Sequence, residues 1–144
     1  MRRLRGVAVL LFTALAAVLI VCLVGALPDR LVFKGGDSYT FYVGNTSKNC
    51  RVVSCPASDA GLTKLTLNGI CGESATFASL DIDEFLRSVN GEIIQTERLD
   101  DSVNYYCKAD LPYSINLFGT TINLHICRRE GSVTVGSPII FGGY

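Results

Sequence analysis

The longest stretch without a charged residue runs from Val7 to Pro28, near the start of the chain. Three arginines within the first five residues precede it. About 20 apolar residues in a helix are enough to cross the hydrocarbon core of a bilayer, whereas the apolar core of a cleaved signal peptide is usually shorter. The small residues that end at Ala26 would nevertheless suit a signal peptidase. The pattern predicts that residues 1–28 are either a membrane anchor or a signal peptide cleaved after Ala26.

The arginines also indicate an orientation. Basic residues that flank an apolar helix stay preferentially on the cytoplasmic side of the membrane. Only Arg30 and Lys34 follow the apolar run closely, so the basic excess lies at its N-terminal end. We therefore expect the chain from Asp29 onward to lie outside the cytoplasm, either anchored and facing outward or secreted.

Apolar and polar residues alternate from Ser38 to Val43, which is typical of a strand with one buried face. The residues expected on the buried face are Tyr39, Phe41 and Val43. A polar turn from Gly44 to Asn49 and a returning strand from Cys50 to Cys55, ended by Pro56, should follow.

The pattern is weaker from Ala57 to Phe77. The leucines between Leu62 and Leu67 suggest a short strand, and Asn68-Gly69 is a turn signal. Gly72 to Thr76 fits another strand or a loop.

One helix is well marked. Asp81 fits an N-cap with Glu84 three residues later, and Leu80 and Phe85 occupy the positions of a hydrophobic staple. The apolar stripe of this helix consists of Ile82, Phe85, Leu86 and Val89. Asn90-Gly91 supplies the left-handed stop. A helix of two to three turns is too short to be stable alone, so its stripe must pack on a sheet.

The C-terminal third is mostly strand. Strands are expected from Ile93 to Arg98 and from Val103 to Ala109, with a turn at Asp100-Asp101-Ser102 between them. After a turn at Glu130-Gly131, a further alternating strand is expected from Val133.

The clearest hairpin signal is Gly119-Thr120, which suits the two-residue loop of a type II′ turn. This register pairs Leu117 with Ile122, Ile115 with Leu124, and Tyr113 with Ile126, all on one apolar face. The polar face then holds Ser114, Asn116, Thr121, Asn123, His125 and Cys127, with Phe118 as its apolar exception. We therefore expect Leu124 to face the core and His125 to face solvent.

These elements amount to an α+β domain with a mainly antiparallel sheet of about six or seven strands and one short helix packed on one face. The expected organisation is a membrane or signal segment at 1–28, a spacer at 29–37 and a single extracytoplasmic domain at 38–144.

Charge excludes one class of function. Residues 29–144 hold 10 basic and all 13 acidic residues, which gives a net charge of −3. Nucleic-acid binding needs clustered Lys and Arg that displace counterions, so no nucleic-acid partner is expected.

Six cysteines are present, one of them, Cys22, in the apolar run. The other five are Cys50, Cys55, Cys71, Cys107 and Cys127. An odd number cannot all pair within one chain, and their density is below that of disulfide scaffolds. We expect no disulfide or one, and the spacing does not identify the pair.

The only histidine, His125, would share a face with Cys127, so a metal or nucleophilic site has to be considered. Zinc needs about four ligands, and the closest thiol pair, Cys50 and Cys55, has the loosest usable spacing. A Cys–His pair needs a structured pocket, but Cys127 should be exposed and Cys107 buried and inert. We therefore predict no metal site.

No catalytic residues and no cofactor are predicted either. The acidic group Asp81, Asp83 and Glu84 is explained by helix capping and the helix dipole. The chain contains no nucleophile elbow, phosphate-binding loop or zinc-protease motif.

Two outward-facing tyrosines fit a surface that contacts a partner or ligand. Tyr42 and Tyr106 should point away from the buried faces of their strands. Asn45-Thr46-Ser47 matches a glycosylation sequon, but a turn explains these residues directly.

The C-terminal segment resembles the signature of the YwmB-like family of exported bacterial proteins, whose fold is described as TATA-box-binding-like. The matching residues are Asn123, Leu124, Arg128, Thr134, Gly136, Pro138, Ile139, Ile140 and Tyr144. The resemblance covers about 22 residues, and the chain departs from the family in being shorter and richer in cysteine. It implies an exported α+β domain of unknown biochemical role, connected with cell-envelope or sporulation functions.

The leading hypothesis is a non-enzymatic envelope domain that binds a protein or cell-wall partner. A pilin-like assembly subunit is the alternative, because a basic leader ending at Gly6 precedes an apolar helix. Leu11, however, stands where such helices need an acidic residue. A small envelope enzyme is the third hypothesis.

Overall fold

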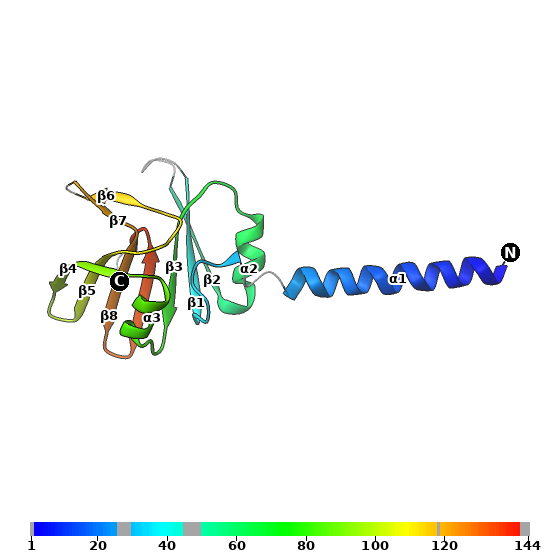
Figure 1. Cartoon of the computed structure of the whole chain (residues 1–144), viewed down its shortest axis with the longest axis horizontal. Helices are drawn as coiled ribbons and strands as arrows, with labels where there is room; N and C mark the ends of the chain where they lie inside the picture. The colour runs from blue at the N-terminus through cyan, green and yellow to red at the C-terminus, as the bar shows by residue number, and fades with distance from the viewer. Residues whose placement is uncertain (1, 26–29, 45–49, 118, 142–144) are drawn as a thin grey trace.

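The computed structural model describes residues 2–25, 30–44, 50–117 and 119–141. The N-terminal helix α1 spans Arg2–Gly25, and the rest of the chain forms a β-rich domain (Figure 1). The elements of that domain are β1 (Ser38–Val43), β2 (Arg51–Pro56), α2 (Ala57–Thr66), β3 (Ile70–Phe77), α3 (Ile82–Ser88), β4 (Glu92–Arg98), β5 (Ser102–Lys108), β6 (Ile115–Leu117), β7 (Thr120–Ile122), β8 (Leu124–Arg129) and β9 (Ser132–Ser137). The α+β class predicted from the sequence is confirmed.

Seven of the strands form one antiparallel sheet in the order β2-β1-β3-β9-β8-β5-β4. Strands β6 and β7 form a separate two-stranded hairpin. The strand count of the main sheet agrees with the sequence prediction. Strands β2 and β4 are its edges, and Figure 1 shows the β6–β7 hairpin lying over one side of the sheet.

One face of the sheet carries the main hydrophobic core. The buried residues of this core are Phe33, Tyr39, Phe41, Ala60, Ala75, Phe77, Leu86, Cys107, Ala109, Leu124, Ile126, Val133 and Val135. The stripe predicted for α3 packs against them, and Asp81 caps this helix, its Oδ1 accepting the Glu84 amide at 2.9 Å. Asn90 ends the helix region with φ 50°, the left-handed conformation that the sequence predicts.

Helix α2 was not predicted; its residues were expected to contain a short strand. The helix follows Pro56, whose extended backbone serves as its N-cap. It buries its small residues Ala60 and Gly61, while Leu62 and Leu65 are 58% and 50% exposed. The leucines were therefore misleading, because the side of the helix that packs on the sheet is built from residues without long side chains.

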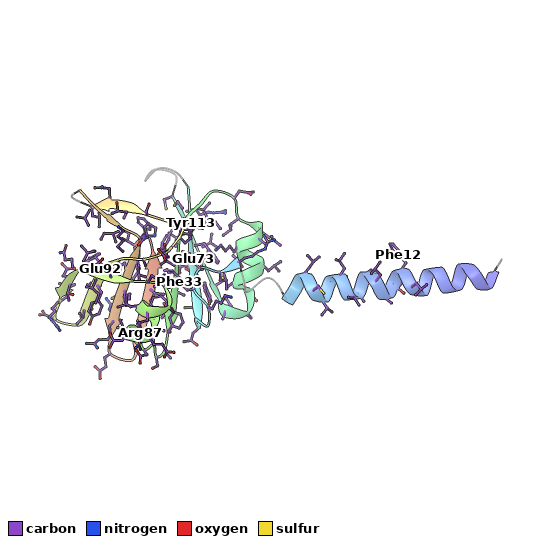
Figure 2. All side chains as sticks on the ribbon, viewed as in Figure 1. Phe12, Phe33, Glu73, Arg87, Glu92 and Tyr113 are labelled. Atoms are coloured by element: carbon purple, nitrogen blue, oxygen red, sulfur yellow. The ribbon has the colours of Figure 1, made fainter. Side chains whose placement is uncertain are left out.

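Strand β3, which the sequence left open between strand and loop, lies inside the sheet between β1 and β9. Its Glu73 is fully buried, and its carboxylate accepts the Lys64 ammonium at 2.6 Å and the Val32 amide at 2.8 Å. Figure 2 labels Glu73 beside Phe33, whose ring is also buried. The segment expected to be a spacer thus contributes to the core through Phe33.

The predicted hairpin register is wrong. Ile115 pairs with Ile122 and Leu117 pairs with Thr120, a shift of two residues. Gly119 still supplies a positive φ of 85° at the turn, whereas Phe118 lies outside the described residues. The hairpin also ends early, because Leu124–Arg129 separates as β8 and pairs with β5 and β9.

A C-terminal segment covers the other face of the sheet, which we call the outer face. After Pro138 the chain turns back, and Ile140 lies against Gly136, where an added Cβ would come within 2.8 Å of its side chain. Phe141 meets the ring of Tyr42 edge-on, with centroids 5.0 Å apart. Tyr42, predicted to point outward as a partner surface, is therefore buried.

Over the side chains that the structure describes, which in α1 begin at Leu11, no helix is both long and apolar enough to span a membrane.

Candidate functional site

His125 lies on the outer face as the strand pattern predicts, but it is not exposed. Only 1% of its surface is accessible, because the C-terminal segment and Tyr106 cover it. The Tyr106 ring stacks on the imidazole with centroids 4.6 Å apart. The prediction of a solvated histidine is wrong, since it treated the polar face of β8 as the surface of the molecule.

Both ring nitrogens of His125 are bonded. The Ile140 amide donates to Nδ1 at 3.3 Å, which requires a lone pair on that nitrogen. The proton of the neutral ring then sits on Nε2, which donates to Asn104 Oδ1 at 3.1 Å. Burial lowers the pKa of this imidazole to about 4, so the ring is neutral at physiological pH.

The two buried thiols of the sheet are not activated. Cys127, expected to be exposed, is 2% accessible, and burial raises its pKa. Cys107 is completely buried, as predicted, and burial raises its pKa to about 11. Both are protonated at neutral pH, and a protonated thiol is a poor nucleophile and metal ligand.

The structure does not bring the remaining candidate residues into one place. Cys50 and Cys55, the marginal zinc pair, are free thiols, as are the other four cysteines. Asp81 serves as the helix cap. In the part of the chain that the structure describes, no three His, Cys, Asp or Glu side chains are gathered as metal ligands. The sequon Asn45-Thr46-Ser47 lies outside the described residues.

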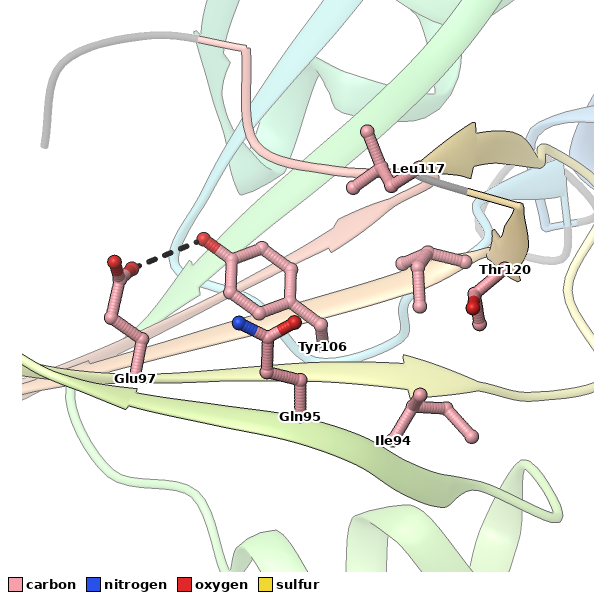
Figure 3. Close-up of a pocket in the computed structure, with 7 residues that line it drawn as sticks. Ile94, Gln95, Glu97, Tyr106, Leu117 and Thr120 are labelled. Atoms are coloured by element: carbon pink, nitrogen blue, oxygen red, sulfur yellow. Dashed lines mark hydrogen bonds between the residues drawn. The ribbon is translucent and has the colours of Figure 1, made fainter.

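A pocket of about 330 Å³ lies where the β6–β7 hairpin faces the edge of the sheet (Figure 3). Its lining residues are Ile94, Gln95, Glu97, Tyr106, Leu117, Thr120 and Ile122. The residues from β4 and β5 form one wall, and those from the hairpin form the other. Of the two tyrosines proposed as a partner surface, only Tyr106 reaches this pocket.

The pocket has a polar part and an apolar part. The Tyr106 hydroxyl donates to Glu97 Oε2 at 3.3 Å, and Glu97 is the only charged residue among the described lining residues (Figure 3). Ile94, Leu117 and Ile122 supply the apolar surface. Such a pocket fits a ligand or side chain with an apolar stem and a positively charged or hydrogen-bonding end.

Ile94 reaches the pocket through an irregularity of β4. The β4–β5 register shifts between Ile93 and Gln95, so Ile94 is an extra, bulged residue. The adjacent isoleucines Ile93-Ile94 break the alternation of the strand, and this was the signal in the sequence that could have indicated the bulge. No pattern in the sequence indicated that the β6–β7 hairpin would face this part of β4.

Strand β4 also ends the sheet. Every one of its seven residues is exposed, including Ile93 and Ile94 at 43% and 42%. An edge strand presents unpaired backbone groups that can accept a further strand. The pocket and this edge together form the candidate site.

No protein-family model, curated protein or solved structure matches the chain. The resemblance of the C-terminal segment to the YwmB-like family stays a prediction.

Proposed function

We propose that the chain is a non-enzymatic binding domain, held at the outer side of a membrane by its N-terminal segment, that binds a partner protein through the pocket and the adjoining β4 edge. The observation that carries this proposal is the position of the pocket beside an exposed edge strand. Among the described residues, the most conspicuous alternative centre, around His125, is closed to solvent and holds a neutral imidazole.

Helix α1 supports membrane attachment. Among the α1 side chains that the structure describes, the large apolar ones are exposed, and Phe12, labelled in Figure 2, is 73% exposed. The other exposed apolar residues of α1 are Leu11, Leu15, Val18, Leu19, Ile20, Val21 and Leu23. A continuous apolar surface of this kind is unfavourable in water, and a bilayer would cover it.

The location is tested by a reporter fused after Tyr144 together with N-terminal sequencing of the native protein. We expect activity outside the cytoplasm, because the arginines precede the apolar run. An intact N-terminus supports an anchor, and cleavage after Ala26 supports secretion. Cleavage after Gly6 would support the pilin-like alternative, and a reporter active in the cytoplasm would refute the proposed location.

Binding is tested by placing a photo-cross-linking amino acid at Thr96 on β4 or at Thr120 in the pocket, in cells that produce the protein. Asp59 on α2 is the matched control, because α2 contacts β1 and β2 at the opposite side of the sheet. We expect one adduct of the same partner at both test positions and none at Asp59. Equal cross-linking at all three positions, or none at the two test positions, would contradict the proposal.

A further inference from the structure

The hydrogen-bonding pattern of the β4–β5 hairpin determines which backbone groups of β4 face outward. The Leu99 amide donates to the Ser102 carbonyl at 2.9 Å, so these two residues form a hydrogen-bonded pair. Such pairs alternate along an antiparallel ladder, which places Glu97 in the next hydrogen-bonded pair, opposite Asn104. The amide and carbonyl groups of Thr96 and Arg98 therefore point away from β5, toward the open edge.

We infer that the partner binds as an extended peptide strand that pairs antiparallel with Thr96–Arg98 and places a lysine opposite Glu97, at the mouth of the pocket. This inference rests on the proposed function and specifies its partner. The peptide residues that flank the lysine exchange hydrogen bonds with Thr96 and Arg98. The lysine itself occupies a non-hydrogen-bonded position, where opposing side chains lie closest.

Charge favours a basic peptide residue at this position. Glu97 Oε2 accepts the Tyr106 hydroxyl, and Oε1 has no hydrogen-bond partner among the described residues. The β4–β5 hairpin adds Glu92, Asp100 and Asp101 against the two basic residues Arg98 and Lys108, so it stays acidic. An ammonium group at Glu97 would be attracted by this surface, while its aliphatic stem would contact the apolar lining.

The bulge in β4 limits pairing with the peptide to the part of the strand that follows Ile94. A bulge disturbs the regular spacing of edge groups and disfavours extended strand addition. In β4 it lies at Ile94, so the regular part of the strand begins at Gln95. The residue two positions from the lysine then lies opposite Gln95, beside Ile94, where an apolar side chain fits.

The probe is the fluorescein-labelled peptide acetyl-Thr-Val-Thr-Lys-Thr-Val-Thr-amide, titrated by fluorescence anisotropy with the full chain in detergent micelles. N-methylation of the two threonines that flank the lysine removes the amides that would bond to β4. We expect this change to weaken binding roughly tenfold, the cost of two hydrogen bonds. N-methylation of the two valines alters amides that face away from β4 and should leave the affinity within twofold.

The interaction between the peptide lysine and Glu97 is tested with the same peptide and two protein variants. Glu97→Gln should weaken binding about fivefold, as expected for one partly exposed ion pair, and replacing the lysine by norleucine should have the same effect. Glu92→Gln removes an identical charge from the same strand outside the pocket, and its affinity should stay within twofold of the wild type. The thermal midpoint of each variant is measured to verify folding.

The outcomes separate this inference from the proposed function. Equal weakening by both N-methylation patterns, or no binding of the lysine peptide to the folded protein, would refute strand addition at β4. Equal effects of Glu97→Gln and Glu92→Gln would refute the specific role of Glu97. In each case, site-specific cross-linking at Thr96 and Thr120 would still support the proposed function, whereas loss of that cross-linking would refute both.

Discussion

Replacement of His125 by alanine is expected to be among the most damaging changes to the domain. The imidazole accepts the Ile140 amide, donates to Asn104 and stacks on Tyr106. Two lost hydrogen bonds of about 1 kcal/mol each and one lost aromatic contact of about 1 kcal/mol add up to roughly 3 kcal/mol. Urea denaturation of the full chain in detergent, followed by tyrosine fluorescence, measures this difference.

The same residue predicts a pH dependence. Its pKa is about 4 in the folded chain, against an ordinary value of 6.5. Between these values the unfolded state binds more protons, so the wild type loses stability as the pH falls through this window. The full loss is about 3 kcal/mol and is reached below the folded pKa.

His125→Gln is the matched control, because a glutamine amide can accept from Ile140 and donate to Asn104 but does not titrate. The carboxylates contribute equally to both proteins, so the difference between their stability curves isolates the imidazole. We expect this difference to change by about 3 kcal/mol between pH 7 and pH 4. Parallel curves for wild type and His125→Gln, or a His125→Ala variant as stable as the wild type, would refute the buried, neutral histidine.

Three further changes test other parts of the fold by urea denaturation. Asp81→Ala should cost about 1 kcal/mol through loss of the helix cap, and an unchanged midpoint would contradict the capping contact. Leu124→Ala should cost about 2–5 kcal/mol because it empties part of the core, so a loss below 1 kcal/mol would contradict its complete burial. Glu73→Ala should cost about 3–5 kcal/mol, since it leaves the Lys64 ammonium without its carboxylate. The double variant with Lys64→Met should recover part of this stability, and the absence of recovery would argue against the ion pair.

The sequence predicted those elements whose signals are local. Strand β1, helix α3 with its Asp81 cap, and the β4–β5 hairpin all appear close to their expected bounds. Helix α2 was missed because its buried side consists of Ala60 and Gly61, which give no hydrophobic stripe. Apolar periodicity and capping signals do not reveal a helix that packs through small residues.

The candidate site could be predicted only in part. Strand β4 was expected, and Tyr106 was named as an outward aromatic residue. The second wall of the pocket comes from Leu117, Thr120 and Ile122, on a hairpin whose register was predicted two residues away from the observed one. Because a pocket is a relation between segments distant in sequence, the pattern within each strand could not reveal it.

The prediction for His125 was wrong because the C-terminal segment covers the outer face of the sheet. The polar face of β8 was expected to meet water, but the segment after Pro138 folds back over it and brings the backbone amide of Ile140 with it. An amide withdrawn even partly from water needs an acceptor, and His125 Nδ1 supplies one only while the ring is neutral. Protonation would remove this acceptor and place an uncompensated charge beneath Tyr106, which also forms a wall of the pocket. Tyr106 thus covers His125 on one side and lines the pocket on another, so the packing around a buried, neutral histidine supports one wall of the pocket.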